Sequence, residues 1–167
     1  MIFKVMLKLY KEIDGQLHYW ETWDRGGKTA VVHWGIVGQQ GDTKKIKSSP
    51  SLSLKETVQL EVEARHKEGY EEIDRGRMVD LEVEYKIDGF GSNEDLAKRH
   101  HLESYLDNVL GWTGLGHVDG GSIGSGTMEI GCVVVDFEIA KSVLENVLKH
   151  PDFKDCSRIY RLNEDDS

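Results

Sequence analysis

Alternation of apolar and polar residues marks the first part of the chain as a β-sheet. Apolar side chains recur at every second position from Phe3 to Leu9, which is the period of a half-buried strand. Glycine-containing turns then separate three further strands, which we expect at residues 17–24, 28–34 and 42–47. Four short strands joined by tight turns predict an antiparallel meander.

A helical pattern follows this sheet. Ser53 with Glu56 three residues later fits a capping box, in which each residue satisfies a backbone N–H group of the other. Apolar side chains then recur at a spacing of four, so that one stripe of the helix can pack on the sheet. The stripe consists of Leu54, Val58 and Val62. Gly69 predicts the helix end, since glycine readily adopts the left-handed conformation found there.

The polar segment at residues 71–77 predicts a domain boundary, and we place the two domains at residues 1–75 and 79–167. The second domain opens with strict alternation from Val79 to Ile87, where apolar residues share one face. The other face carries Asp80, Glu82, Glu84, Lys86 and Asp88. Its acids are either a solvated surface or a surface for a basic partner.

The rest of the second domain alternates between helices and strands. A helix capped by Ser92 should end at Gly111, and a second helix should begin after Asp136. Strands are expected at 115–122, 127–135 and 157–162. The order βαββαβ is the split-βαβ plan of ferredoxin-like folds, and the whole chain is therefore predicted to be α+β.

The two cysteines test this topology. In the split-βαβ plan the first strand is central, between the third and fourth strands. Cys132 lies in the third strand and Cys156 at the start of the fourth, so the first strand should separate them. We therefore expect two thiols and no disulfide.

Residues 1–75 resemble the WGR domain. The shared features are Trp34-Gly35, Val37-Gly38, Gly41 and the ending Lys67, Gly69, Tyr70. The resemblance implies a small sheet with one helix. In DNA-dependent poly(ADP-ribose) polymerases this domain binds broken DNA ends through its tryptophan and arginine. Ile36 stands here at the arginine position and supplies no charge. The C-terminal half is similar to uncharacterised bacterial ferredoxin-like α/β domains, which implies no function.

The resemblance leads to a nucleic-acid hypothesis with four residues. An exposed tryptophan can stack on a base or sugar while lysines neutralise phosphates. The candidates are Trp34, Lys44, Lys45 and Lys47. In the alternative interpretation, the tryptophan belongs to the core and the lysines form a solvated face.

A glycine-rich stretch at residues 111–131 is the second candidate site. We interpret it as a ligand or partner loop, because glycine-rich loops combine mobility with contacts. Its candidate residues are Trp112, Gly114, His117, Asp119, Gly121, Gly124 and Gly126. The alternatives are an anion-binding, nucleotide-binding or enzymatic site, and an irregular hairpin that needs glycines for its turns. No phosphate-loop motif, nucleophile elbow or triad spacing is present, and two possible ligands make no metal site.

Charge favours a protein partner over nucleic acid. Residues 1–78 carry 13 Lys+Arg and 12 Asp+Glu, whereas residues 79–167 carry 8 and 18. Such an acidic half would repel a phosphate backbone. We expect no membrane segment, no cofactor, no metal and no catalytic residue, and without an export signal we expect a cytoplasmic location. The sequence thus predicts a non-enzymatic binding protein, with DNA-end binding as the alternative.

Overall fold

The computed structural model describes residues 6–162, so Phe3 and Val5 of the predicted first strand lie outside the described residues. The chain divides into two compact units, residues 1–73 and 74–167, which we call the N-terminal and C-terminal units. The division falls within the polar segment 71–77. Each unit is described by itself below.

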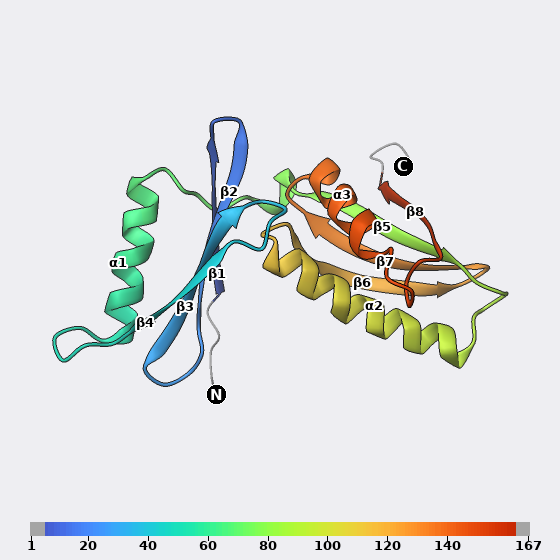
Figure 1. The fold of residues 1–167 in the computed structure, drawn as a ribbon, viewed down its shortest axis with the longest axis horizontal. Helices are drawn as coiled ribbons and strands as arrows, with labels where there is room; N and C mark the ends of the chain where they lie inside the picture. Colours follow the sequence, from blue (N-terminus) through green and yellow to red (C-terminus); the bar gives the residue numbers. More distant parts are fainter. Residues whose placement is uncertain (1–5, 163–167) are drawn as a thin grey trace. The chain divides into compact units, whose positions relative to one another are not determined.

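The N-terminal unit is the predicted antiparallel meander with one helix (Figure 1). Its elements are β1 (Met6–Ile13), β2 (Gln16–Asp24), β3 (Thr29–Ile36), β4 (Asp42–Lys47) and α1 (Leu54–Lys67). Each strand pairs with its neighbours in sequence, in the order β1-β2-β3-β4. The expected strand bounds agree with the observed ones to within one or two residues from β2 onward.

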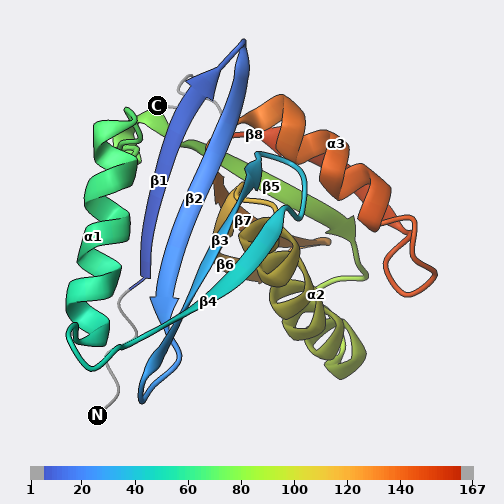
Figure 2. The same ribbon diagram turned by 60° about the vertical axis from the view of Figure 1, so that its left-hand side comes forward.

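Helix α1 covers one face of this sheet (Figure 2). The predicted capping box is confirmed, with the Ser53 hydroxyl accepting from the backbone N–H of Glu56. Gly69, at φ +94°, follows the last helical turn as expected. The core between helix and sheet consists of Leu9, Trp20, Val32 and Val62, with Leu7, Ile46, Val58 and Tyr70 packed around it. Burial of each such apolar side chain contributes about 1.5–3 kcal/mol.

The Trp34-Gly35 stretch has a structural role at the turn between β3 and β4. The Tyr19 hydroxyl donates to the carbonyl oxygen of Gln39 in this turn, at 2.8 Å. A Cβ atom on Gly35 would lie 3.0 Å from that hydroxyl, and one on Gly41 only 2.6 Å from it. Both glycines therefore leave room for a tyrosine hydroxyl that fastens the turn to the sheet.

A buried histidine holds the same turn from β3. His33 is fully buried, and its Nδ1 donates to Oε1 of Glu21 at 2.6 Å. Its Nε2 lies within hydrogen-bond distance of the carbonyl oxygen of Gln40 and 3.1 Å from the Tyr19 hydroxyl. Lys8 lies 3.5 Å from the second oxygen of Glu21. Among the described residues, Oε2 of Glu21 has this ion pair and no hydrogen bond. The bonds of the two His33 ring nitrogens nevertheless specify one arrangement of the backbone, that of the 37–41 turn.

The C-terminal unit has the predicted βαββαβ order. Its elements are a short 3₁₀ turn (Arg75–Arg77), β5 (Val79–Lys86), α2 (Asn93–Trp112), β6 (Gly116–Gly124), β7 (Thr127–Val134), α3 (Phe137–Val147) and β8 (Cys156–Arg161). The strand order is β6-β7-β5-β8, so the α+β prediction is confirmed and the first strand, β5, lies between the third and the fourth. The thiols of Cys132 and Cys156 are both free, on strands to either side of β5.

The core of this unit lies on the sheet face that α2 and α3 cover (Figures 1 and 2). Leu81, Val83 and Tyr85 of β5 are almost completely buried there. The Tyr85 hydroxyl donates to the carbonyl oxygen of Phe153 at 2.6 Å, which fastens the loop after α3 to the sheet. Because side chains alternate along β5, Glu82 and Glu84 lie on the sheet face that α2 and α3 do not cover, as the sequence predicted.

Residues 111–131 form a helix end and a β-hairpin in place of an extended loop, and the strands expected at 115–122 and 127–135 are both present. Helix α2 continues past Gly111 to Trp112, and β6 occupies Gly116–Gly124. The helix therefore ends one residue beyond the expected Gly111, and the Thr113 hydroxyl donates to the Val109 carbonyl oxygen at this end. The hairpin interpretation is the closer one, because β6 and β7 pair along the rest of the stretch.

Candidate functional site

Two features that were separate in the sequence meet on the sheet face opposite α2 and α3. One row of register partners crosses all four strands as Gly120, Gly131, Glu82 and Tyr160. The next row contains Ser122, Glu129, Glu84 and Arg158. The acids of β5 therefore lie beside the glycine-rich β6 and β7, because β7 is inserted between β6 and β5.

The paired glycines leave a hollow in this face. Gly120 and Gly131 face each other without side chains, and a cavity of about 300 Å³ opens beside them. Four carboxylates line it from β5, β6 and β7: Asp80, Glu82, Asp119 and Glu129. Its further lining residues include Leu81, Gly121, Ser122, Cys132 and Leu162. We call this site the acidic pocket.

Three of the four pocket carboxylates are held by contacts of their side chains: Asp80 by an ion pair with Arg75, at 2.5 Å from Nη2, and Glu82 and Glu129 by hydroxyl groups. The Tyr160 hydroxyl donates to Oε2 of Glu82 at 2.6 Å, and this bond, with burial, raises the pKa of Tyr160 to about 12. Glu129 accepts from the hydroxyls of Ser122 at 2.8 Å and Thr127 at 2.5 Å. Glu82 and Glu129 both keep acceptor positions beyond these bonds, because an ionised carboxylate can accept about four hydrogen bonds.

The negative charge of the neighbouring acid, Glu84, is already balanced by an ion pair with Arg158. Glu84 is only 7% exposed, and it accepts from Nε and Nη2 of Arg158 at 3.1 and 3.0 Å and from the Ser157 hydroxyl at 2.9 Å. Burial raises the pKa of Glu84, but the Arg158 and Ser157 contacts outweigh it and hold the pKa below its usual range. The Arg158 guanidinium also lies 3.9 Å from the centre of the Tyr160 ring. This sheet face therefore already holds one guanidinium between a carboxylate and an aromatic ring.

The arrangement suits a cationic ligand group better than catalysis. Burial raises the pKa of Cys132 to about 12, so its thiol does not ionise near neutral pH. Ser122 bonds to Glu129, and His117 is absent from the pocket lining, so no serine–histidine pair forms there. Within residues 6–162, no group of three or more His, Cys, Asp or Glu side chains is placed to hold a metal ion.

Only part of the predicted 111–131 site belongs to the pocket. Asp119 and Gly121 line it. The other candidates are distributed along this segment: Trp112 ends α2, Gly114 lies in the turn after it, His117 and Gly124 belong to β6, and Gly126 forms the hairpin turn. The site residues that sequence reasoning did not assign are Glu82 as a pocket residue, Glu129, Tyr160, Gly120 and Gly131. The alternation of β5 contained the signal that Glu82 lies on the face away from the core.

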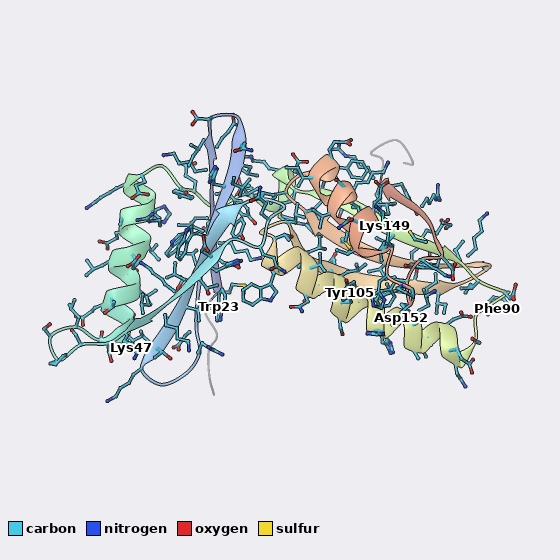
Figure 3. All side chains as sticks on the ribbon, viewed as in Figure 1. Trp23, Lys47, Phe90, Tyr105, Lys149 and Asp152 are labelled. Atoms are coloured by element: carbon cyan, nitrogen blue, oxygen red, sulfur yellow. The ribbon has the colours of Figure 1, made fainter. Side chains whose placement is uncertain are left out.

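The four nucleic-acid candidates do not form one surface. Trp34 is 36% exposed and lies opposite Asp42 in the β3–β4 ladder. Lys44 is on the α1 side, where its Nζ is 3.1 Å from Glu61. Lys45 and Lys47 lie on the opposite face of β4 from Lys44, because side chains alternate along a strand. Lys47 is labelled in Figure 3 at the end of β4.

Comparisons with known proteins add no family to this picture. No protein-family profile, curated protein or solved structure matches the chain. Among the helices of residues 6–162, none is both long and apolar enough to cross a membrane.

Proposed function

We propose that this chain is a non-catalytic interaction protein that binds a basic protein partner through the acidic pocket. The observation that carries the proposal is the cavity of about 300 Å³ that is lined by Gly120 and Gly131 and by carboxylates from three adjacent strands. A lysine or arginine side chain supplies donors only, and the pocket carboxylates supply acceptors only. Strands hold these acceptors more rigidly than a loop would, which reduces the entropy lost on binding.

We also propose that the N-terminal unit is a WGR-like scaffold without the DNA-reading role. The turn that follows its Trp34-Gly35 stretch supports this assignment, because Tyr19 and His33 fasten Gln39 and Gln40 of this turn to the sheet. The pairing of Lys44 with Glu61 lowers the positive charge beside Trp34. Unlike a DNA-end binder, this unit should show no steep dependence of DNA affinity on salt.

The proposal predicts that neutralising the pocket weakens binding of a basic peptide much more than neutralising other acids. The pocket variant is Glu82→Gln, Asp119→Asn, Glu129→Gln, and the matched control is Glu94→Gln, Glu138→Gln, Asp155→Asn. Both remove three negative charges. Calorimetric titration with an eight-residue peptide of alternating basic residues and glycine, at 0.15 M salt, should show affinity about 10–100-fold lower for the pocket variant, from three contacts of about 0.5–1 kcal/mol each.

The control acids should contribute little, because salt at this concentration screens charges beyond about 8 Å. We expect the control variant to bind within about threefold of the unaltered protein. Equal losses in the two variants would mean that net charge alone attracts the peptide, and would contradict a built site. Absence of binding to the unaltered protein at low salt would contradict the proposed function as a whole.

A further inference from the structure

The outer edge of β8 is unpaired within the sheet of the C-terminal unit. β8 is the last strand in the order β6-β7-β5-β8, and among the described strands it pairs with β5 alone. The N–H of Leu162 donates to the carbonyl oxygen of Asp80 at 3.0 Å, which sets the phase of the ladder. In an antiparallel pair the bonded residues alternate, so the main-chain groups of Ile159 and Arg161 point away from β5.

Basic side chains gather around this edge although the unit is acidic. Residues 149–161 contain four Lys and Arg residues and two acids, whereas the full chain has a net charge of −9. A groove of about 400 Å³ runs beside the start of β8. Its apolar lining is Leu148 and Ile159, its basic lining is Lys149, Lys154 and Arg158, and its acidic lining is Glu145. Lys149 is exposed just beyond α3 (Figure 3).

We propose that the β8 edge binds an extended acidic segment of another protein as a fifth strand. Main-chain bonds to Ile159 and Arg161 would supply affinity, as in other cases of strand addition. The exposed cations Lys149, Lys154 and Arg161 would select an acidic sequence. Arg158 contributes less charge to the edge because it is paired with Glu84.

The same cations disfavour the other obvious occupant, a second copy of β8. Charged edge residues commonly prevent edge-to-edge pairing of identical strands. Antiparallel pairing of two β8 strands would bring Arg158 and Arg161 of both copies into one short ladder, and like charges across strands are destabilising. The carboxylates of an acidic strand would instead be attracted by these cations. The same basic side chains therefore disfavour a second copy of β8 and favour an acidic partner.

The test uses the full chain and an eight-residue peptide in which glutamate or aspartate alternates with valine. Titration followed by amide nuclear magnetic resonance should shift the Ile159 and Arg161 resonances and slow exchange of these two amide hydrogens. A control peptide has the same sequence but is N-methylated at every second residue. It keeps the charge and loses the backbone N–H donors along one edge of the strand. It should bind at least about tenfold more weakly, since each lost bond costs about three- to tenfold in affinity.

A pair of variants at Arg161 separates charge from main-chain bonding. Arg161→Ala removes the charge alone and should weaken binding about two- to fivefold. Arg161→Pro also removes the outward N–H, which β5 does not use, and should weaken binding about threefold to tenfold further. Equal affinity of the two peptides, equal effects of the two variants, or no binding at low salt would overturn the proposal. Dimerisation with exchange protection at β8 would overturn it in favour of a second copy.

Discussion

Replacing Gly41 with alanine is expected to destabilise the N-terminal unit by about 3–5 kcal/mol, the range of the most damaging single substitutions. Gly41 has φ +66°, and an added Cβ would lie 2.1 Å from the carbonyl oxygen of Trp34 and 2.6 Å from the Tyr19 hydroxyl. Neither atom can move freely, because the first is backbone and the second bonds to Gln39. The substitution should therefore break the bonds that hold the 37–41 turn.

Gly15→Ala is the matched control. Gly15 has φ +77°, a similarly left-handed backbone, but an added Cβ would have no atom within 4 Å. Its cost is the backbone strain alone, about 1–2 kcal/mol. Hydrogen exchange read separately for peptides of each unit should show faster opening of the N-terminal unit in Gly41→Ala than in Gly15→Ala. Similar opening in the two variants would show that the close approach to Tyr19 is not important.

Removing the Glu84 side chain is expected to destabilise the C-terminal unit by about 2–3 kcal/mol at pH 7, since bonds to a charged group contribute about 1.5–3 kcal/mol. In Glu84→Ala the Arg158 guanidinium and the Ser157 hydroxyl lose their shared acceptor. Denaturant unfolding measured on this variant and on Glu84→Gln tests the expectation, because glutamine keeps the volume and one acceptor while losing the charge. Glu84→Gln should therefore lie between the alanine variant and the unaltered protein.

The same carboxylate should make stability depend on pH. Its pKa is lower in the folded protein than in an unfolded chain, where glutamate titrates near 4.3. The stabilisation by ionised Glu84 is thus fully present above the unfolded pKa, and it is lost as pH falls through the folded pKa. Between about pH 5 and 3, the unaltered protein should lose more unfolding free energy than Glu84→Gln. Parallel pH profiles of the two proteins would contradict this role.

Local signals were sufficient to predict the elements. The serine caps of α1 and α2 and the aspartate cap of α3 are all present, since a cap depends on three or four consecutive residues. Gly111 predicted the end of α2 to within one residue, since the helix ends at Trp112. The β5 alternation and the βαββαβ order were enough to place β5 between β7 and β8.

The candidate site was predictable only in parts. The sequence indicated acids on one face of β5 and a glycine-rich stretch, but not that Gly131 would be the register partner of Glu82. Register depends on packing between distant segments, which no local pattern contains. The division of Lys44 and Lys45 between two faces was available from strand alternation alone. Trp34 required the structure, because its register partners Trp20 and Asp42 come from other strands.

Mapping a bound basic peptide onto the chain tests the acidic pocket most directly. Titration of the full chain with the alternating basic peptide, followed by amide nuclear magnetic resonance, should shift a contiguous set of signals. We predict saturable shifts at Gly120, Ser122, Glu129 and Gly131, with little change at the exposed acids Glu94 and Glu138. Shifts spread over all acidic surfaces, or no shift at the paired glycines, would contradict the pocket as the binding site.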